Sequence, residues 1–271
     1  MPIWLKLGMA NGSYGPNSAE PAALGLYNGL VQIGKKRAGK SNSDRFLMES
    51  VVTKDTKLRT FIASSSTRKD IISSVYNVIS DTVAGLEDSP LILVEDSIIK
   101  GSTLQRRIVD LLVRAGASRL FIVSSCPQLR FICPYGIEMA SLGELLAFRA
   151  AVSLITKGGR QPFLDDIYAA AQTQQARIDS DTQFIPENLV QKIYDQSTYA
   201  EVSSEIGEHL RPPGWDGELF VLYPDVAGFR DSLGQKRDDA CISGSYPESG
   251  GLRVLNQALL NYFEKSDAKA Y

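Results

Sequence analysis

The chain has 271 residues, 44% of them hydrophobic and 22% charged, with a formal net charge of −2, which is enough apolar material to bury a large core. It offers no basic surface for nucleic acid, no apolar run long enough to span a membrane, no signal-peptide order at its start, and only three cysteines for any disulfide framework. We therefore expect a cytoplasmic protein without nucleic-acid or membrane partners.

The first predicted element is a helix over residues 22–33, where apolar residues recur at helical spacing. Gly34–Ser41 then matches the pattern G-x-x-x-x-G-K-S of a P-loop nucleotidase. A P-loop lies between a strand and a helix, so a predicted helix ahead of it leaves this interpretation a remote alternative. We expect residues 35–58 to be poorly ordered alone and to close over a bound substrate as a lid.

The most informative segment runs from Leu91 to Leu104. Four apolar residues predict a buried strand, two adjacent carboxylates follow at Glu95 and Asp96, and a short Ser/Gly/Thr loop leads into a predicted helix that ends at Gly116. A second apolar run at residues 120–123 completes a strand, helix, strand unit, which connects parallel strands. The loop is therefore expected at the carboxyl end of a parallel strand, where open α/β sheets bind ligands.

The residue types of this loop indicate a phosphate-binding site. Backbone N–H groups and hydroxyls suit a phosphate monoester, and they come from Ser97, Ile98, Ile99, Lys100, Gly101, Ser102 and Thr103. Glu95 and Asp96 suit the two hydroxyls of a ribose and the water shell of Mg²⁺, which prefers few direct carboxylates together with substrate phosphates. A ribose that carries a 5-phosphate would fit both halves.

The second half of the sequence predicts mostly helices. Helical spacing covers residues 140–155, 164–178, 186–199, 201–210, 225–233 and 252–263, with one strand at 219–223. We expect an N-terminal segment at residues 1–14, a sheet core at 15–145 and a C-terminal extension packed on it at 146–271. The single histidine, His209, has no assignable Ser or Cys partner and is expected to be a surface or packing residue.

Leu91–Leu104 resembles the phosphoribosyl pyrophosphate (PRPP) motif of type I phosphoribosyltransferases. Four flanking strings narrow the resemblance to glutamine amidophosphoribosyltransferases: residues 16–18 with 21–25, residues 59–62 with Arg68, residues 124–141, and residues 244–258. The strings follow the order of that family. The resemblance implies an α/β type I phosphoribosyltransferase fold, a parallel sheet flanked by helices, with a mostly helical C-terminal extension.

The resemblance also implies a transferase of purine biosynthesis, which replaces the pyrophosphate of PRPP with ammonia to give 5-phosphoribosylamine. It implies catalytic roles for Arg59, Glu95 and Asp96. It places PRPP contacts at Asn17, Ser18, Lys57 and the loop 97–103, and Mg²⁺ coordination at Ser18, Glu95 and Asp96. A homo-oligomer is expected.

The sequence departs from the family in places. The family begins with a catalytic cysteine after its initiator methionine, carried by a glutaminase domain; here Pro2 takes that position and no such domain fits ahead of Pro16. The chain is expected either to be a fragment, served by a glutaminase domain upstream or in trans, or to use free ammonia. Residues 52–58 replace a basic, tyrosine-containing stretch, and Glu95 stands where aspartate is more usual.

Other functions stay open at this point. A phosphoribosyltransferase for a purine or pyrimidine base would share residues 91–104 but needs a base-binding hood, which the sequence does not identify. A PRPP-binding regulator would bind without turnover and should carry a basic surface for nucleic acid, which the composition does not support. An interaction protein with an inactive site would not need this loop intact. No iron–sulfur cluster is expected: Cys133 and Cys241 match two of the four cysteines that hold one in some family members, but Asp238 stands where a third is needed.

Overall fold

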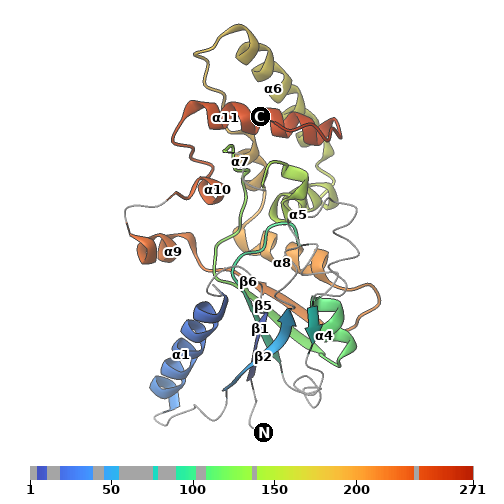
Figure 1. The fold of residues 1–271 in the computed structure, drawn as a ribbon. Coiled ribbons are helices and arrows are strands. Elements are labelled where there is room, and N and C mark those ends of the chain that lie inside the picture. The colour runs from blue at the N-terminus through green and yellow to red at the C-terminus, as the bar shows by residue number, and fades with distance from the viewer. Residues whose placement is uncertain are drawn as a thin grey trace. The chain divides into compact units, whose positions relative to one another are not determined.

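The computed structural model describes residues 5–10, 19–38, 46–54, 76–78, 90–101, 108–135, 139–234 and 238–270. The chain forms two compact units (Figure 1). The first comprises Met1–Cys126 with Leu210–Tyr223, and the second comprises Pro127–His209 with Pro224–Tyr271. The sheet core was predicted to end at residue 145. In the structure the first unit instead ends at Cys126 and also includes the later segment Leu210–Tyr223.

The first unit contains a sheet whose described strands follow the order β3-β2-β1-β4-β5-β6. The strands are Leu5–Ala10 (β1), Phe46–Lys54 (β2), Tyr76–Val78 (β3), Leu91–Glu95 (β4), Arg119–Ser124 (β5) and Glu218–Leu222 (β6). Neighbouring strands are parallel, except that β3 is antiparallel to β2. This arrangement confirms the predicted α/β class and the parallel pairing of β4 with β5.

The central strand β4 is buried on both faces, as its uninterrupted apolar sequence predicts. Leu91 and Leu93 are fully buried, in register with Leu120 and Ile122 of β5. On the opposite face Ile92 and Val94 form a cluster with Ala23 of the helix α1 (Ala19–Ala38), which Figure 1 shows alongside the sheet. The strand that carries the acidic pair is thus fixed from both sides.

The helix α4 (Asp110–Arg114) connects β4 to β5 and ends as the sequence predicts. Gly116 has a φ of +102°, and its N–H donates to the carbonyl of Val113. The N–H of Ala117 donates to Leu112, which gives the paired bonds of a Schellman motif. Thr103, in the loop that leads into this predicted helix, lies outside the described residues.

The structure excludes the remote P-loop alternative and corrects one prediction for residues 34–58. Residues 34–38 belong to α1 and are preceded by helix rather than strand, so the P-loop interpretation of Gly34–Ser41 is wrong. The predicted lid is wrong at residues 46–54, which form β2 between β1 and β3. The apolar β-formers of this segment gain backbone hydrogen bonds on both sides, which a mobile lid would forgo.

The second unit is helical, apart from its connecting loops. Its helices are a 3₁₀ turn at Leu142–Glu144, Leu146–Lys157 (α5), Gln161–Ser180 (α6), Leu189–Tyr194 (α7), Tyr199–Leu210 (α8, whose last residue groups with the first unit), Val226–Leu233 (α9), Ala240–Ser243 (α10) and Ser249–Phe263 (α11). Among the residues described, no helix has both the length and the apolar character of a membrane span.

The core of the second unit is built around aromatic rings. Tyr194 is buried between Phe131 and Phe148, with ring centroids 5.6 and 6.4 Å away, and Phe148 meets Tyr262 edge-on at 4.9 Å. The Tyr194 hydroxyl donates to the carbonyl of Arg130 at 2.8 Å, so the polar end of this buried ring is satisfied.

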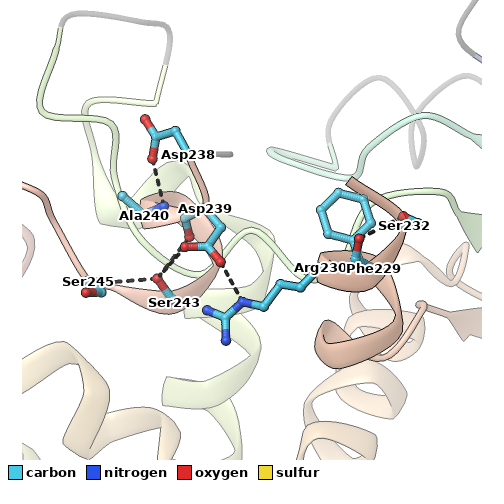
Figure 2. Close-up of polar contacts among 8 residues, drawn as sticks. All are labelled: Phe229, Arg230, Ser232, Asp238, Asp239, Ala240, Ser243 and Ser245. Carbon is cyan, nitrogen blue, oxygen red and sulfur yellow. Dashed lines mark hydrogen bonds and ion pairs between the residues drawn. The ribbon is translucent and has the colours of Figure 1, made fainter. Parts of the chain in front are cut away.

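An ion pair links α9 to the residue before α10 across residues 235–237, which are not described, and two further hydrogen bonds lie at the start of α10 (Figure 2). The Nε of Arg230 donates to the carboxylate of Asp239 at 2.5 Å, and Ser243 Oγ donates to the same carboxylate at 3.2 Å. Asp238 accepts the N–H of Ala240 at 3.0 Å. These bonds fix the start of α10, which carries Cys241.

Candidate functional site

The predicted ligand loop follows β4 at the point where the strand order reverses. The chain passes from β1 outward to β2 on one side, whereas β4 pairs with the other side of β1 and is followed outward by β5 and β6. In open parallel sheets ligands bind outside the carboxyl ends of the strands at such a reversal. The topology therefore places the end of β4 where a ligand site is expected.

The acidic pair sits at this edge in two different environments. Glu95 is the last residue of β4 and is largely buried, whereas Asp96 is exposed. Burial, and after it the charge of Asp96, raises the pKa of Glu95 to about 8. Two neighbouring carboxylates in this position attract a cation, since a positive charge offsets both the burial and the repulsion that raise the pKa of Glu95.

The loop after the acidic pair is anchored at its start. The N–H of Ser97 donates to Asp96 Oδ1 at 2.7 Å, and the side chain of Ile98 is buried. Gly101 has a φ of +73°, a conformation that a side chain disfavours. A loop anchored in this way keeps its backbone close to the strand end, as a phosphate-binding loop requires.

The loop after β5 contacts the acidic pair, which the sequence interpretation did not anticipate. Ser125 donates its N–H to the carbonyl of Glu95 and its hydroxyl to the carbonyl of Asp96. Burial, with a smaller contribution from Asp96, raises the pKa of the Cys126 thiol to about 11, so this thiol stays protonated at neutral pH. The position of Ser125 directly after β5, which is parallel to β4, was the signal in the sequence that could have identified it.

Six predicted site residues lie outside the described part of the chain: Asn17, Ser18, Lys57, Arg59, Ser102 and Thr103. Their roles stay predictions. The structure brings together Glu95, Asp96 and the loop residues Ser97, Ile98, Ile99, Lys100 and Gly101, which are contiguous in sequence.

Within the described residues no group of three or more His, Cys, Asp or Glu side chains is arranged to hold a metal ion. Glu95 and Asp96 nevertheless fit Mg²⁺ that arrives with a substrate, because this ion takes one or two carboxylates and completes its shell with phosphate oxygens and water. At the predicted third cysteine position, Asp238 instead caps the N–H of Ala240 (Figure 2).

Arg130 belongs to the packing of the second unit. Its guanidinium lies over the rings of Tyr194 and Tyr199, 4.7 and 4.8 Å from their centroids, and Nε donates to Gln128 Oε1 at 3.0 Å. Burial lowers the pKa of this arginine, against the opposing influence of both tyrosines. It is thus not the solvated surface arginine that residue type alone suggests.

A hollow of about 760 Å³ lies at the opposite edge of the sheet, where β5 and β6 begin. It is lined by Trp215, Asp216 and the ion-paired Arg119 and Glu218, among others. Strand amino ends meet here, so this hollow is separate from the acidic pair at the carboxyl ends of the same sheet.

Comparisons with known proteins agree with the motif. The chain is 33% identical to the amidophosphoribosyltransferase of Haemophilus influenzae over 119 residues, 43% of this chain and 23% of that protein. It is 38% identical to the enzyme of Methanocaldococcus jannaschii over 89 residues, 33% of this chain and 18% of that protein. With the Mycobacterium leprae enzyme it shares 32% identity over 133 residues, 49% of this chain and 21% of that protein.

No family model matches the sequence. A solved structure of glutamine PRPP amidotransferase from B. subtilis, complexed with ADP and GMP, aligns with 91% of this chain and 38% of that one, at 21% identity and a TM-score of 0.45. The chain spans about a fifth of the length of the curated relatives named above. The chain is similar to amidophosphoribosyltransferases of bacteria and archaea across one third to one half of its own length.

Proposed function

We propose that this chain is a type I phosphoribosyltransferase that acts on PRPP and ammonia, giving 5-phosphoribosylamine in the first step of de novo purine (IMP) synthesis. The observation that carries the proposal is the position of Glu95, Asp96 and the loop to Gly101 at the order reversal of a parallel sheet. The similarity of part of the chain to amidophosphoribosyltransferases supports the same reaction.

The acidic pair and the loop that follows it supply the binding of the ribose 5-phosphate half of PRPP. Glu95 and Asp96 accept hydrogen bonds from the two ribose hydroxyls and hold Mg²⁺, together with Ser18. The loop from Ser97 to Thr103 donates backbone and hydroxyl hydrogen bonds to the 5-phosphate. Mg²⁺ supplies charge neutralisation for the pyrophosphate when it is bound.

The reaction needs no protein nucleophile. The bond from the ribose C1 to pyrophosphate breaks, the nitrogen lone pair of ammonia forms the new bond to C1, and the nitrogen then loses a proton. Arg59 and Lys57 stabilise the charge of the departing pyrophosphate. Catalysis of this displacement depends on positioning and on charge stabilisation.

The source of ammonia and the assembly complete the proposal. Ammonia is taken free from solution or from a glutaminase domain located upstream or in trans. The protein is a cytoplasmic homo-oligomer and carries no iron–sulfur cluster.

Ligand binding is tested by thermal denaturation of the full chain. PRPP with Mg²⁺ at about 100 times its dissociation constant should stabilise the fold by about 2.7 kcal/mol, and Asp96→Asn should remove most of this gain. Asp216→Asn is the matched control, an exposed carboxylate of the same unit that lines the hollow at the opposite sheet edge. An unchanged melting curve for folded wild type in millimolar PRPP and Mg²⁺ refutes binding.

Turnover is tested by pyrophosphate release with different acceptors. Ammonia should support release at a rate that rises with pH as ammonium deprotonates, and glutamine should yield no glutamate. Release with a purine or pyrimidine base, but not with ammonia, would identify a base phosphoribosyltransferase. A thermal shift without turnover would identify a PRPP-binding regulator.

A further inference from the structure

The loop that follows β5 completes the hydrogen bonding at the end of β4. Glu95 and Ser124 are the last register pair of the two strands. Beyond them, Ser125 donates its N–H to the carbonyl of Glu95 at 2.8 Å and its hydroxyl to the carbonyl of Asp96 at 3.0 Å. One residue thus binds the main chain of both members of the acidic pair.

The conformation of this loop is itself defined. The Ser124 hydroxyl donates to the carbonyl of Cys126 at 2.7 Å and accepts the N–H of Cys126 at 3.3 Å. These bonds hold residues 124–126 in a tight turn beside Asp96. The donor on Ser125 is therefore presented by a fixed backbone rather than by a free chain.

The carbonyl that Ser125 binds belongs to the peptide that joins Asp96 to Ser97. The N–H of this peptide donates to Asp96 Oδ1 at 2.7 Å. Rotation of the peptide would turn the carbonyl, the N–H and the bound carboxylate together. A hydrogen bond to the carbonyl consequently restricts the direction of the Asp96 side chain.

We infer that Ser125 is a positioning residue for the reaction, whose hydroxyl holds the Asp96–Ser97 peptide and so aims the Asp96 carboxylate at the ribose and its cation. The inference rests on the proposed function. Ser125 acts through the main chain in this role, because its hydroxyl hydrogen is donated to the carbonyl of Asp96. A displaced carboxylate loses rate even when it is still present, since small errors in position are costly in catalysis.

The test compares substitutions of Ser125 that keep or remove the hydroxyl. Ser125→Ala should lower kcat/KM for PRPP roughly two- to tenfold, the range expected for one hydrogen bond, and leave the KM for ammonia unchanged. Ser125→Thr keeps the hydroxyl and should restore the rate. Ser125→Cys, which has a weak donor of similar size, should behave like alanine and carries the test if the alanine variant does not fold.

Ser232→Ala is the matched control, because the Ser232 hydroxyl is also exposed and donates to a main-chain carbonyl, that of Phe229 at 2.7 Å (Figure 2). It should leave kcat/KM unchanged. A double-mutant cycle adds a readout that a merely structural serine would not move: in an Asp96→Asn background, Ser125→Ala should have almost no further effect on kcat/KM.

The outcomes separate the inference from the proposed function. A wild-type chain with neither a PRPP-dependent thermal shift nor pyrophosphate release refutes the proposed function and, with it, this role for Ser125. An active wild type refutes the inference alone if Ser125→Ala keeps full kcat/KM, if threonine fails to restore it, or if the loss adds fully to that of Asp96→Asn.

Discussion

A buried carboxylate, Glu205, ties α5 to α8 in the second unit. Only 6% of its side chain is exposed, and Lys157 Nζ lies 2.6 and 2.7 Å from its two oxygens. Ser153 donates to Oε1 at 2.6 Å, and His209 Nε2 lies 3.3 Å from the same oxygen. Burial raises the pKa of Glu205, but the bonds from Lys157 and Ser153 hold it below its usual value.

Two substitutions of this cluster should differ in cost. Glu205→Gln removes the charge and leaves Lys157, whose side chain is 60% exposed, to be solvated by water, so we expect a loss of about 2 kcal/mol. Lys157→Met leaves the buried Glu205 carboxylate without its cation, and a buried charge left without its partner costs about 3 kcal/mol or more. The lysine substitution should therefore destabilise the protein more than the glutamate substitution.

The free energy of unfolding is measured by urea denaturation with far-UV circular dichroism. Glu187→Gln is the matched control, since Glu187 pairs with Lys192 at 2.8 Å while both side chains are largely exposed, and it should cost less than about 1 kcal/mol. Because the folded-state pKa of Glu205 is lowered, its contribution is present above pH 4.5 and is lost as pH falls through that pKa. Equal losses for Glu205→Gln and Glu187→Gln would refute the reasoning.

Three further predictions follow from single residues. Burial lowers the pKa of His209, so its single imidazole NMR signal should titrate below 6.5 and its contribution to stability should be lost as pH falls below 6.5; a midpoint above 6.5 contradicts this. Because the pKa of Glu95 is raised in the folded state, its contribution to the free energy of unfolding is present below pH 4.5 and is lost as pH rises through about 8. The free energy of unfolding of Glu95→Gln should therefore fall less than that of the wild type between pH 6 and pH 9. Equal losses in the two proteins contradict this. Gly244→Ala should lower the free energy of unfolding, measured in urea, more than Gly159→Ala. Both glycines have a positive φ, +69° and +67°, but a new Cβ lies 2.7 Å from Phe131 at position 244 and in open space at position 159. Equal losses contradict this.

The sequence by itself determined the parts of the site that are local. Leu91–Val94, the acidic pair and the loop to Gly101 are contiguous, and the short apolar run between turn signals is sufficient to predict a buried strand followed by a ligand loop. The end of α4 at Gly116 was equally predictable, because a left-handed glycine terminates a helix through its own neighbours.

The tertiary structure decided what depends on distant residues. β6 pairs with β5 although 93 positions separate Ser124 from Glu218, and β2 is a strand because β1 and β3 lie on its two sides. The lid prediction failed at residues 46–54 for this reason, since a sequence pattern does not include the partners of a strand.

The electrostatics of the site have the same origin. Glu95 and Asp96 are adjacent carboxylates with the same local chemistry, yet burial raises the pKa of Glu95 to about 8 while Asp96 remains exposed. The contact of Ser125 with both residues arises because parallel strands bring their carboxyl ends to one edge of the sheet. The sequence specified which groups the site contains, and the packing of β4 between its neighbours decided how each group is charged and aimed.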